Sequence, residues 1–139
     1  MTKEDLIKGL NEDLAAEWGT ILRYTYQSGK VVGLRGAELR EIFEKEIPDE
    51  LGHAKYLTDV VADLGGEPTT KPKEFDKPED LKGMIELDFK MEQGDVQNYT
   101  KHSKMAGELG LTELKVKLEE MAADESRHAR ELHRILKGL

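Results

Sequence analysis

The chain carries one set of metal-binding residue types twice. Each set consists of a glutamate followed at a distance by a Glu-x-x-His motif, and the spacing inside the two sets is identical. The two sets are Glu17, Glu50 and His53, and Glu92, Glu125 and His128. Tyr24 recurs as Tyr99 at the same offset that relates the two sets. A single Glu-x-x-His motif means little, but two at one spacing from an upstream glutamate indicate a duplicated helical hairpin built around a metal site.

Four segments with helical periodicity position these residues. They span about residues 2–29, 39–64, 76–109 and 112–135. Thr2 with Asp5 resembles a capping box for the first segment, and Thr112 is the expected cap of the fourth. We expect Asp76 to open the third segment, with a proline in its first turn. Pro48 lies inside the second segment, so we expect a kink or a local break in hydrogen bonding there.

Connection lengths predict the topology. The turns near residues 30–36 and 109–112 are short, so the first two segments, and the last two, form antiparallel hairpins. The middle connection, irregular from Glu67 to Lys77, can span about 40 Å when extended, which permits one long crossover. The midpoint of each glutamate pair falls inside the turn of its own hairpin, so all four glutamates should lie in one layer. We predict an all-α four-helix bundle that forms a single domain over residues 1–139.

The glutamate layer favours bound metal. Each glutamate interrupts an apolar stripe, so its side chain should point inward, with each histidine one turn along the same face. Four buried carboxylates resist ionising together without compensation. Two divalent cations would neutralise them, and carboxylate oxygen with imidazole nitrogen suits iron or manganese, with zinc a usable substitute. The alternative is a polar layer that sets the register of the helices without metal.

Composition excludes other kinds of site. The chain has no cysteine, which rules out Fe–S, rubredoxin-like and thiolate zinc sites. A net charge of −8 argues against nucleic acid as a partner, because phosphates would be repelled, and is compatible with attracting cations. No apolar run approaches the roughly 20 residues needed to cross a bilayer, and the first residues are not those of a secretory signal. We therefore expect no membrane partner and a cytoplasmic location.

The arrangement is similar to that of ferritin-like di-metal carboxylate proteins, in which two helices each supply a Glu and two supply Glu-x-x-His. The chain resembles bacterioferritin and rubrerythrin over nearly all of its length. Residues 49–54 and 124–128 resemble the two paired motifs of bacterioferritin in position and spacing. The resemblance implies one metal held by Glu17 and His53, a second held by Glu92 and His128, and two bridging carboxylates, Glu50 and Glu125.

Three differences limit what the resemblance implies. Leu51 and Gly52 occupy the stretch in which bacterioferritin carries its haem-binding Met, so we expect no haem. The short fifth helix that lines a symmetry axis of the storage cage has no counterpart after Leu139. We therefore expect a homodimer or other small homo-oligomer, packed through the outer faces of the first two helices. The rubredoxin module of rubrerythrin would need four cysteines.

Four residues flank the expected ligands. Tyr24 and Tyr99 match positions where related proteins place a phenol, and we expect Tyr24 to donate a hydrogen bond to a ligand carboxylate. Glu46 breaks the repeat, and is either a solvated edge residue or a third cation position or relay for incoming iron. Asp95 lies where rubrerythrins carry an extra metal ligand. Because an aspartate side chain is shorter, we expect Asp95 to lie beside the metal without binding it. Direct binding of the metal by Asp95 is the alternative.

Other polar and aromatic residues are assigned ordinary roles. Asp13 and Asp88 are also related by the offset of the repeat, but they lie at the borders of their stripes, so we expect them to cap or to face solvent. His102 and His133 belong to no Glu-x-x-His motif and are expected at the surface. Trp18 is expected to pack or to form an interface.

The expected function is that of a di-iron ferroxidase. The six ligands would bind two Fe(II) ions, which react with O2 or H2O2, in iron detoxification or storage. One alternative is a rubrerythrin-like peroxide reductase, in which iron stays bound and an external electron donor restores it. That activity would depend on Asp95, whereas a ferroxidase would depend on Glu46. The other alternative is a non-catalytic metal-binding bundle, with zinc or manganese in place of iron.

Overall fold

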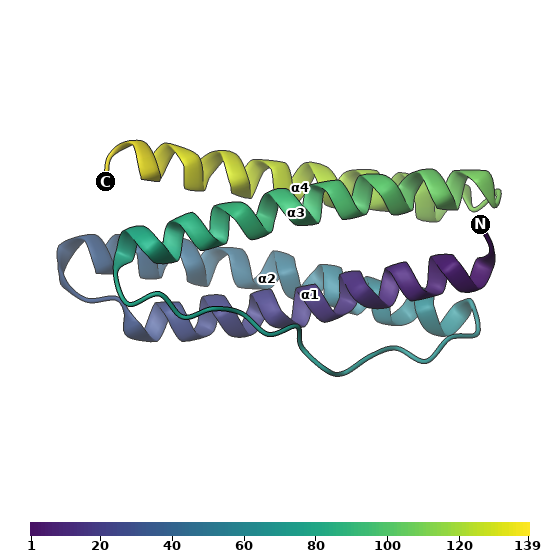
Figure 1. The fold of residues 1–139 in the computed structure, drawn as a ribbon, viewed down its shortest axis with the longest axis horizontal. Coiled ribbons are helices and arrows are strands. Elements are labelled where there is room, and N and C mark those ends of the chain that lie inside the picture. The colour runs from purple at the N-terminus through teal and green to yellow at the C-terminus, as the bar shows by residue number, and fades with distance from the viewer.

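The computed structural model describes all 139 residues and contains four long α-helices and no strand. They are α1 (Lys3–Lys30), α2 (Gly33–Asp63), α3 (Leu81–Glu108) and α4 (Thr112–Lys137). α1 and α2 form one hairpin, α3 and α4 form the other, and the two hairpins pack lengthwise (Figure 1). The predicted all-α four-helix bundle is confirmed. None of the helices has an apolar stretch long enough to cross a membrane.

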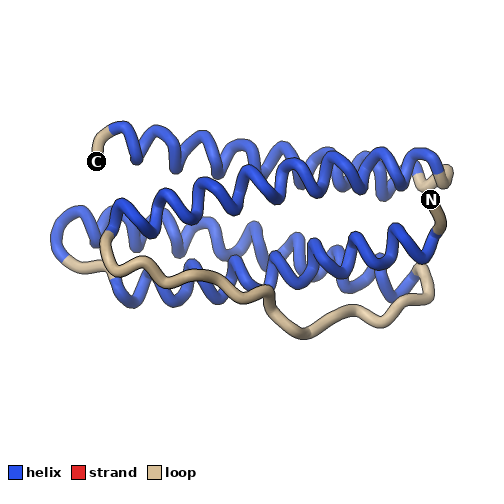
Figure 2. The backbone as a smooth tube through the Cα atoms, in the orientation of Figure 1, coloured by secondary structure: helices blue, strands red, loops and turns tan.

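The crossover segment, residues 64–80, runs the length of the bundle from the end of α2 to the start of α3, as predicted (Figure 2). Hydrogen bonds attach this segment to α1 along its course. The indole N–H of Trp18 donates to the carbonyl of Thr69 at 3.0 Å. The N–H of Lys73 donates to the carbonyl of Ala15 at 2.9 Å. Trp18 therefore holds the connection that places the second hairpin beside the first.

The helix starts agree with the sequence in part. Thr2 and Asp5 form the predicted capping box of α1. The predicted start of α3 at Asp76 is wrong, because α3 begins after Asp80, whose side chain accepts a hydrogen bond from the N–H of Gly83 at 2.9 Å. Asp80 satisfies one of the free N–H groups of the first turn, so the cap forms later in the chain than the local pattern suggests.

Two further details of the helices differ from expectation. Thr112 is the first residue of α4 rather than its cap, and Leu111 takes the cap position without a side-chain hydrogen bond. α2 continues through Pro48 without ending. The expected break is limited to the hydrogen bond that proline cannot donate to the carbonyl of Glu44.

Two apolar clusters fill the interior on either side of a polar layer. One contains Leu10, Leu57 and Leu118, and the other contains Phe43 and Ile85, all fully buried. Burial of such side chains contributes about 1.5–3 kcal/mol each to folding. The clusters therefore hold the four helices rigidly around the polar layer between them.

Candidate metal centre

The six predicted ligands lie together in the polar layer midway along the bundle. Each helix supplies one glutamate, α2 and α4 each add a histidine, and no member is more than 5% exposed. Two groups have ligand atoms that all lie within 4.8 Å of one another: Glu17, Glu50, His53 and Glu125, and Glu50, Glu92, Glu125 and His128. Glu50 and Glu125 belong to both groups. The layer is therefore two adjoining ligand clusters that share two carboxylates.

Two tyrosines hold the unshared glutamates from across the bundle. The hydroxyl of Tyr24 on α1 donates to Oε1 of Glu92 on α3 at 2.6 Å. The hydroxyl of Tyr99 on α3 donates to Oε1 of Glu17 on α1. Burial raises the pKa of both tyrosines well above the ordinary value, so both remain protonated donors. The hydrogen bond expected from Tyr24 is present, and Tyr99 makes its symmetric counterpart.

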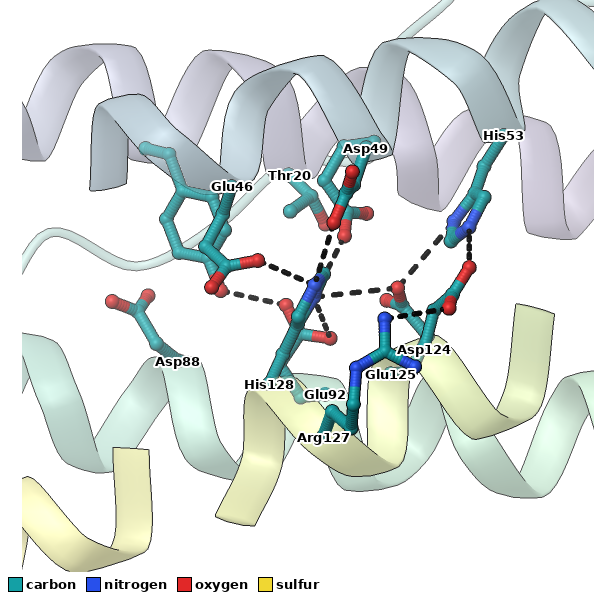
Figure 3. A network of polar contacts seen from close by, with 12 residues as sticks. Thr20, Glu46, Asp49, His53, Asp88, Glu92, Asp124, Glu125, Arg127 and His128 are labelled. Atoms are coloured by element: carbon teal, nitrogen blue, oxygen red, sulfur yellow. Dashed lines mark hydrogen bonds and ion pairs between the residues drawn. The ribbon is translucent and has the colours of Figure 1, made fainter. Parts of the chain in front are cut away.

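His53 is oriented by a carboxylate on its outer side. Its Nε2 lies 2.9 Å from Oδ2 of Asp124, and Arg127 donates to the other oxygen of Asp124 at 2.7 Å. Its Nδ1 lies 3.4 Å from Glu125, which Figure 3 shows, and it also lies 3.5 Å from Glu17. A histidine whose outer nitrogen is bound by a carboxylate presents its other nitrogen in a fixed direction. For His53 that direction is inward.

His128 has the same orientation but a different partner. Its Nδ1 lies 3.0 Å from Oε1 of Glu50, inside the layer. Its Nε2 contacts a carboxylate oxygen of Glu46, while Asp49, the counterpart of Asp124 in the repeat, is 3.4 Å away (Figure 3). Glu46, Asp49 and His128 form a third close group of ligand atoms. Glu46 is therefore a half-buried partner of His128 rather than a solvated edge residue.

The sequence reasoning missed Asp49 and Asp124 as partners of the histidines. A signal was present, because each immediately precedes the second glutamate of its set and the two occupy equivalent positions of the repeat. Their side chains reach across from α2 to His128 on α4 and from α4 to His53 on α2. The exchange between helices could not be deduced from either motif alone.

Three surface assignments are wrong, those of His102, Asp13 and Asp88. His102 is buried, with Nδ1 2.5 Å from Oδ2 of Asp13. Asp88 is also buried, and it accepts hydrogen bonds from Nε of Arg23 at 2.8 Å and from Nε2 of Gln27 at 2.9 Å. Asp13 on α1 and Asp88 on α3 both lie where these two helices pack against each other. This packing buries residues at the borders of the apolar stripes, which a single helix would leave exposed.

The remaining assignment of this kind, an exposed His133, is confirmed. His133 stacks on Phe89 with ring centroids 5.3 Å apart. It takes no part in the polar layer.

The unsatisfied polar atoms of the layer fit bound cations. Eleven buried side-chain nitrogen and oxygen atoms lack a hydrogen-bond partner, and eight of them belong to the six predicted ligands. They include Nδ1 of both histidines, and both oxygens of Glu50 and Glu125. Buried polar atoms are normally paired, so a concentration of unpaired acceptors in one layer is what a cation-binding site requires. The donor set of carboxylate oxygen and imidazole nitrogen fits two divalent ions.

The titration behaviour of the layer reflects the same crowding of negative charge. Burial raises the pKa of Glu17 to about 8. Burial, together with the charges of neighbouring glutamates, raises the pKa of Glu50 and Glu125 well above the ordinary value. Burial acts in the same direction on Glu92, but the close approach of His128 and Glu125, together with the hydrogen bond from Tyr24, outweighs it and leaves the pKa of Glu92 below its usual value. Without metal, the raised pKa values therefore favour the protonated carboxyls of Glu17, Glu50 and Glu125 at neutral pH, while Glu92 stays ionised.

Asp95 is not a member of any of the three close groups. It lies one turn after Glu92, half-buried, and it lines a surface cavity between α3 and the crossover segment. Burial and the negative charges of Glu92 and Glu50 raise the pKa of Asp95 well above its usual value. The structure thus places Asp95 beside the layer and outside the ligand clusters.

Comparison with known proteins supports these observations. The family model of the ferritin-like domain matches residues 7–139. A solved ferritin-like, diiron-carboxylate protein from Bacillus anthracis str. Ames is 43% identical over 98% of this chain and 99% of that one, with a TM-score of 0.95. A bacterioferritin from Mycobacterium tuberculosis is 26% identical over 96% of this chain and 84% of that one, with a TM-score of 0.82. A dodecameric thioferritin from Bacteroides fragilis, 21% identical with a TM-score of 0.87, shares the fold over 99% of this chain and 88% of that one. A search among curated proteins gave no match.

Proposed function

Because this chain belongs to the ferritin-like domain family, we propose that it binds two Fe(II) ions and oxidises them with O2 or H2O2, in the detoxification or storage of iron. The observation that carries the proposal is the set of eight unpaired ligand atoms in one buried layer. Glu17 and His53 would hold one ion, Glu92 and His128 the other, and Glu50 and Glu125 would bridge them. Iron supplies one-electron chemistry towards the oxidant when it is bound.

The surrounding residues prepare the ligands for this task. Tyr24 and Tyr99 each occupy one oxygen of a glutamate, which leaves the second oxygen free to face the centre. Asp124 and Glu46 occupy the outer nitrogens of the histidines, which leaves both Nδ1 atoms available. Pre-oriented ligands of this kind lose little conformational freedom when a cation binds. Carboxyls that hold protons in the metal-free protein must release them on binding.

Anaerobic titration with Fe(II) tests the binding, and stopped-flow mixing with O2 or with H2O2 then tests the reaction. We expect two Fe(II) per chain and rapid oxidation of both. Glu50→Ala should lose most of the second equivalent, because a bridging carboxylate serves both ions. Glu86→Ala, on the exposed surface of α3, is the control and should behave as the unmodified protein. One Fe(II) or none per chain would overturn the proposal.

A further inference from the structure

A cavity of about 400 Å³ lies between the crossover segment and α3. Residues 73–76 line it on one side, and Met91, Gly94 and Asp95 line it on the α3 side. The crossover segment approaches α1 closely here, because a Cβ on Gly19 would stand only 2.6 Å from the carbonyl oxygen of Lys73. The cavity is therefore a defined opening on the α1–α3 side of the bundle, at the level of the metal layer.

Asp95 connects this cavity with the layer. It lies between Glu92 and Tyr99 at helical spacing, and on a helix such positions share one face. Glu92 is fully buried, and Tyr99 is buried and donates to Glu17, whereas Asp95 is half-buried and lines the cavity. The strongest charges that act on Asp95, those of Glu92 and Glu50, are negative. A cation at Asp95 would offset them.

On the opposite side of the layer, the outward nitrogens of both histidines already have partners. Asp124 occupies the outer nitrogen of His53, and Glu46 occupies that of His128. A cavity of about 440 Å³ lies outside His128, but three basic residues line it with three carboxylates: Lys45, Arg127 and Arg130, and Glu46, Asp49 and Glu131. In the α3 cavity three carboxylates face two lysines: Glu74, Asp76 and Asp95, and Lys73 and Lys90. A cation at Asp95 favours the ionised carboxylate, and the α3 cavity then has one carboxylate more than it has lysines, so its field is the more favourable one for a cation.

We propose that divalent cations reach the centre through the α3 cavity, and that Asp95 is a transient ligand that passes them to Glu17 and Glu92. The inference rests on the proposed function and adds its route. Glu46 was the expected relay for incoming iron, but Glu46 is the partner of His128. The proposal therefore assigns the relay to Asp95. Asp95 leaves the final ligand set unchanged, so it should affect how fast a cation arrives and departs, and not how many cations bind.

The glycines of the chain allow the route to be blocked without touching a ligand. A Cβ added at Gly94 meets no atom within 4 Å, so Gly94→Leu should fill the cavity mouth, and in a helix interior the change favours folding. Gly52 on α2 also has open space at its Cβ and is exposed, on the histidine side of the layer. Gly52→Leu is therefore a matched control with the same change in helix propensity.

Stopped-flow binding of Co(II), a redox-silent probe with visible absorption, measures the route independently of oxidation. We expect Gly94→Leu and Asp95→Asn each to slow Co(II) binding by about tenfold, within the range by which a charged cleft raises association rates. Both should reach two Co(II) per chain at equilibrium, which also shows that they fold. Gly52→Leu should bind at the unmodified rate.

Three results would overturn the route while leaving the proposed function intact. They are unmodified rates in Gly94→Leu and Asp95→Asn, a slower rate in Gly52→Leu, or loss of a Co(II) equivalent in Asp95→Asn, which would make Asp95 a resident ligand. Failure of the unmodified protein to bind two Fe(II) in the anaerobic titration, as well as two Co(II) here, would overturn the proposed function together with its route.

Discussion

The hydroxyl of Tyr24 lies 2.6 Å from Oε1 of Glu92, across the seam between the two hairpins. Tyr99 makes the equivalent contact with Glu17 in the opposite direction, from α3 to α1. Each tyrosine also belongs to one of the two apolar clusters that border the layer. The two contacts therefore tie the ligand layer to the hydrophobic packing above and below it.

Tyr24→Phe should lower the free energy of unfolding of the metal-free protein by about 1–3 kcal/mol, because it leaves a buried glutamate oxygen without a donor. Urea unfolding in the presence of a chelator measures the change. Tyr26→Phe removes the hydroxyl of a tyrosine that is 36% exposed and should have little effect. Equal destabilisation by the two changes would show that the Tyr24 hydrogen bond contributes nothing.

Asp124→Ala and Glu46→Ala should differ in their effects on metal affinity. Removal of Asp124 leaves the outer nitrogen of His53 without a carboxylate, and losses of about 10–100-fold are typical when such a partner is removed. Removal of Glu46 leaves Asp49 only 3.4 Å from His128 and able to replace it, so the loss should be smaller. Competition with a chromophoric chelator for Co(II) compares the two variants. A larger loss in Glu46→Ala would contradict the replacement.

The metal-free protein should lose stability as the pH rises from about 5 to 8. Burial raises the pKa of Glu17 from 4.5 to about 8, so the folded protein keeps a proton that the unfolded chain releases in this interval. Stability falls with rising pH wherever the folded state binds more protons, by about 1.4 kcal/mol per pH unit for each proton. Urea unfolding at several pH values, with and without Co(II), measures the slope. The metal-loaded protein should show a flatter dependence, and rising stability over the same interval without metal would contradict the prediction.

Asp88→Ala should cost about 3–5 kcal/mol of stability, because it leaves the fully buried guanidinium of Arg23 without its carboxylate. Replacing both residues by leucine should restore most of the loss, since neither charge then remains in the interior. Glu119→Ala, which breaks an exposed pair with Lys115, should change stability by less than about 1 kcal/mol. Thermal unfolding of the three variants provides the comparison. A double variant as unstable as Asp88→Ala would show that the pair is needed for more than charge compensation.

We expect a homodimer or other small homo-oligomer packed through the outer faces of α1 and α2. Leu22 on α1 and Leu51 on α2 are 49% and 52% exposed, so both are free to contact a second copy of the chain. Light scattering of the purified protein should give a mass of two or a few times the 15.7 kDa chain, and Leu51→Glu should shift it towards the monomer. A mass of several hundred kilodaltons would instead indicate a shell.

The position of the ligand layer follows from the sequence alone. In an antiparallel hairpin the height of a residue depends on its distance from the turn, because the rise per residue of a helix is constant. Glu17 and Glu50 lie at similar distances from the first turn, 13 and 17 residues from the adjoining ends of α1 and α2, and Glu92 and Glu125 lie 16 and 13 residues from the adjoining ends of α3 and α4. The constant offset of the repeat therefore determined which side chains meet, and the length of the middle connection permitted the topology.

The contacts between α1 and α3 were decided only by the tertiary structure. Asp13 pairs with His102, and Asp88 pairs with Arg23, but α3 follows α2 through a crossover segment that is long enough to allow many registers of α3 against α1. The hydrogen bond from Trp18 to Thr69 attaches the crossover segment to α1 and so selects one of these registers. The choice of Glu46 over Asp49 as the partner of His128 has the same origin, because both lie on one face of α2 and only the distance between packed helices decides which carboxylate reaches the imidazole.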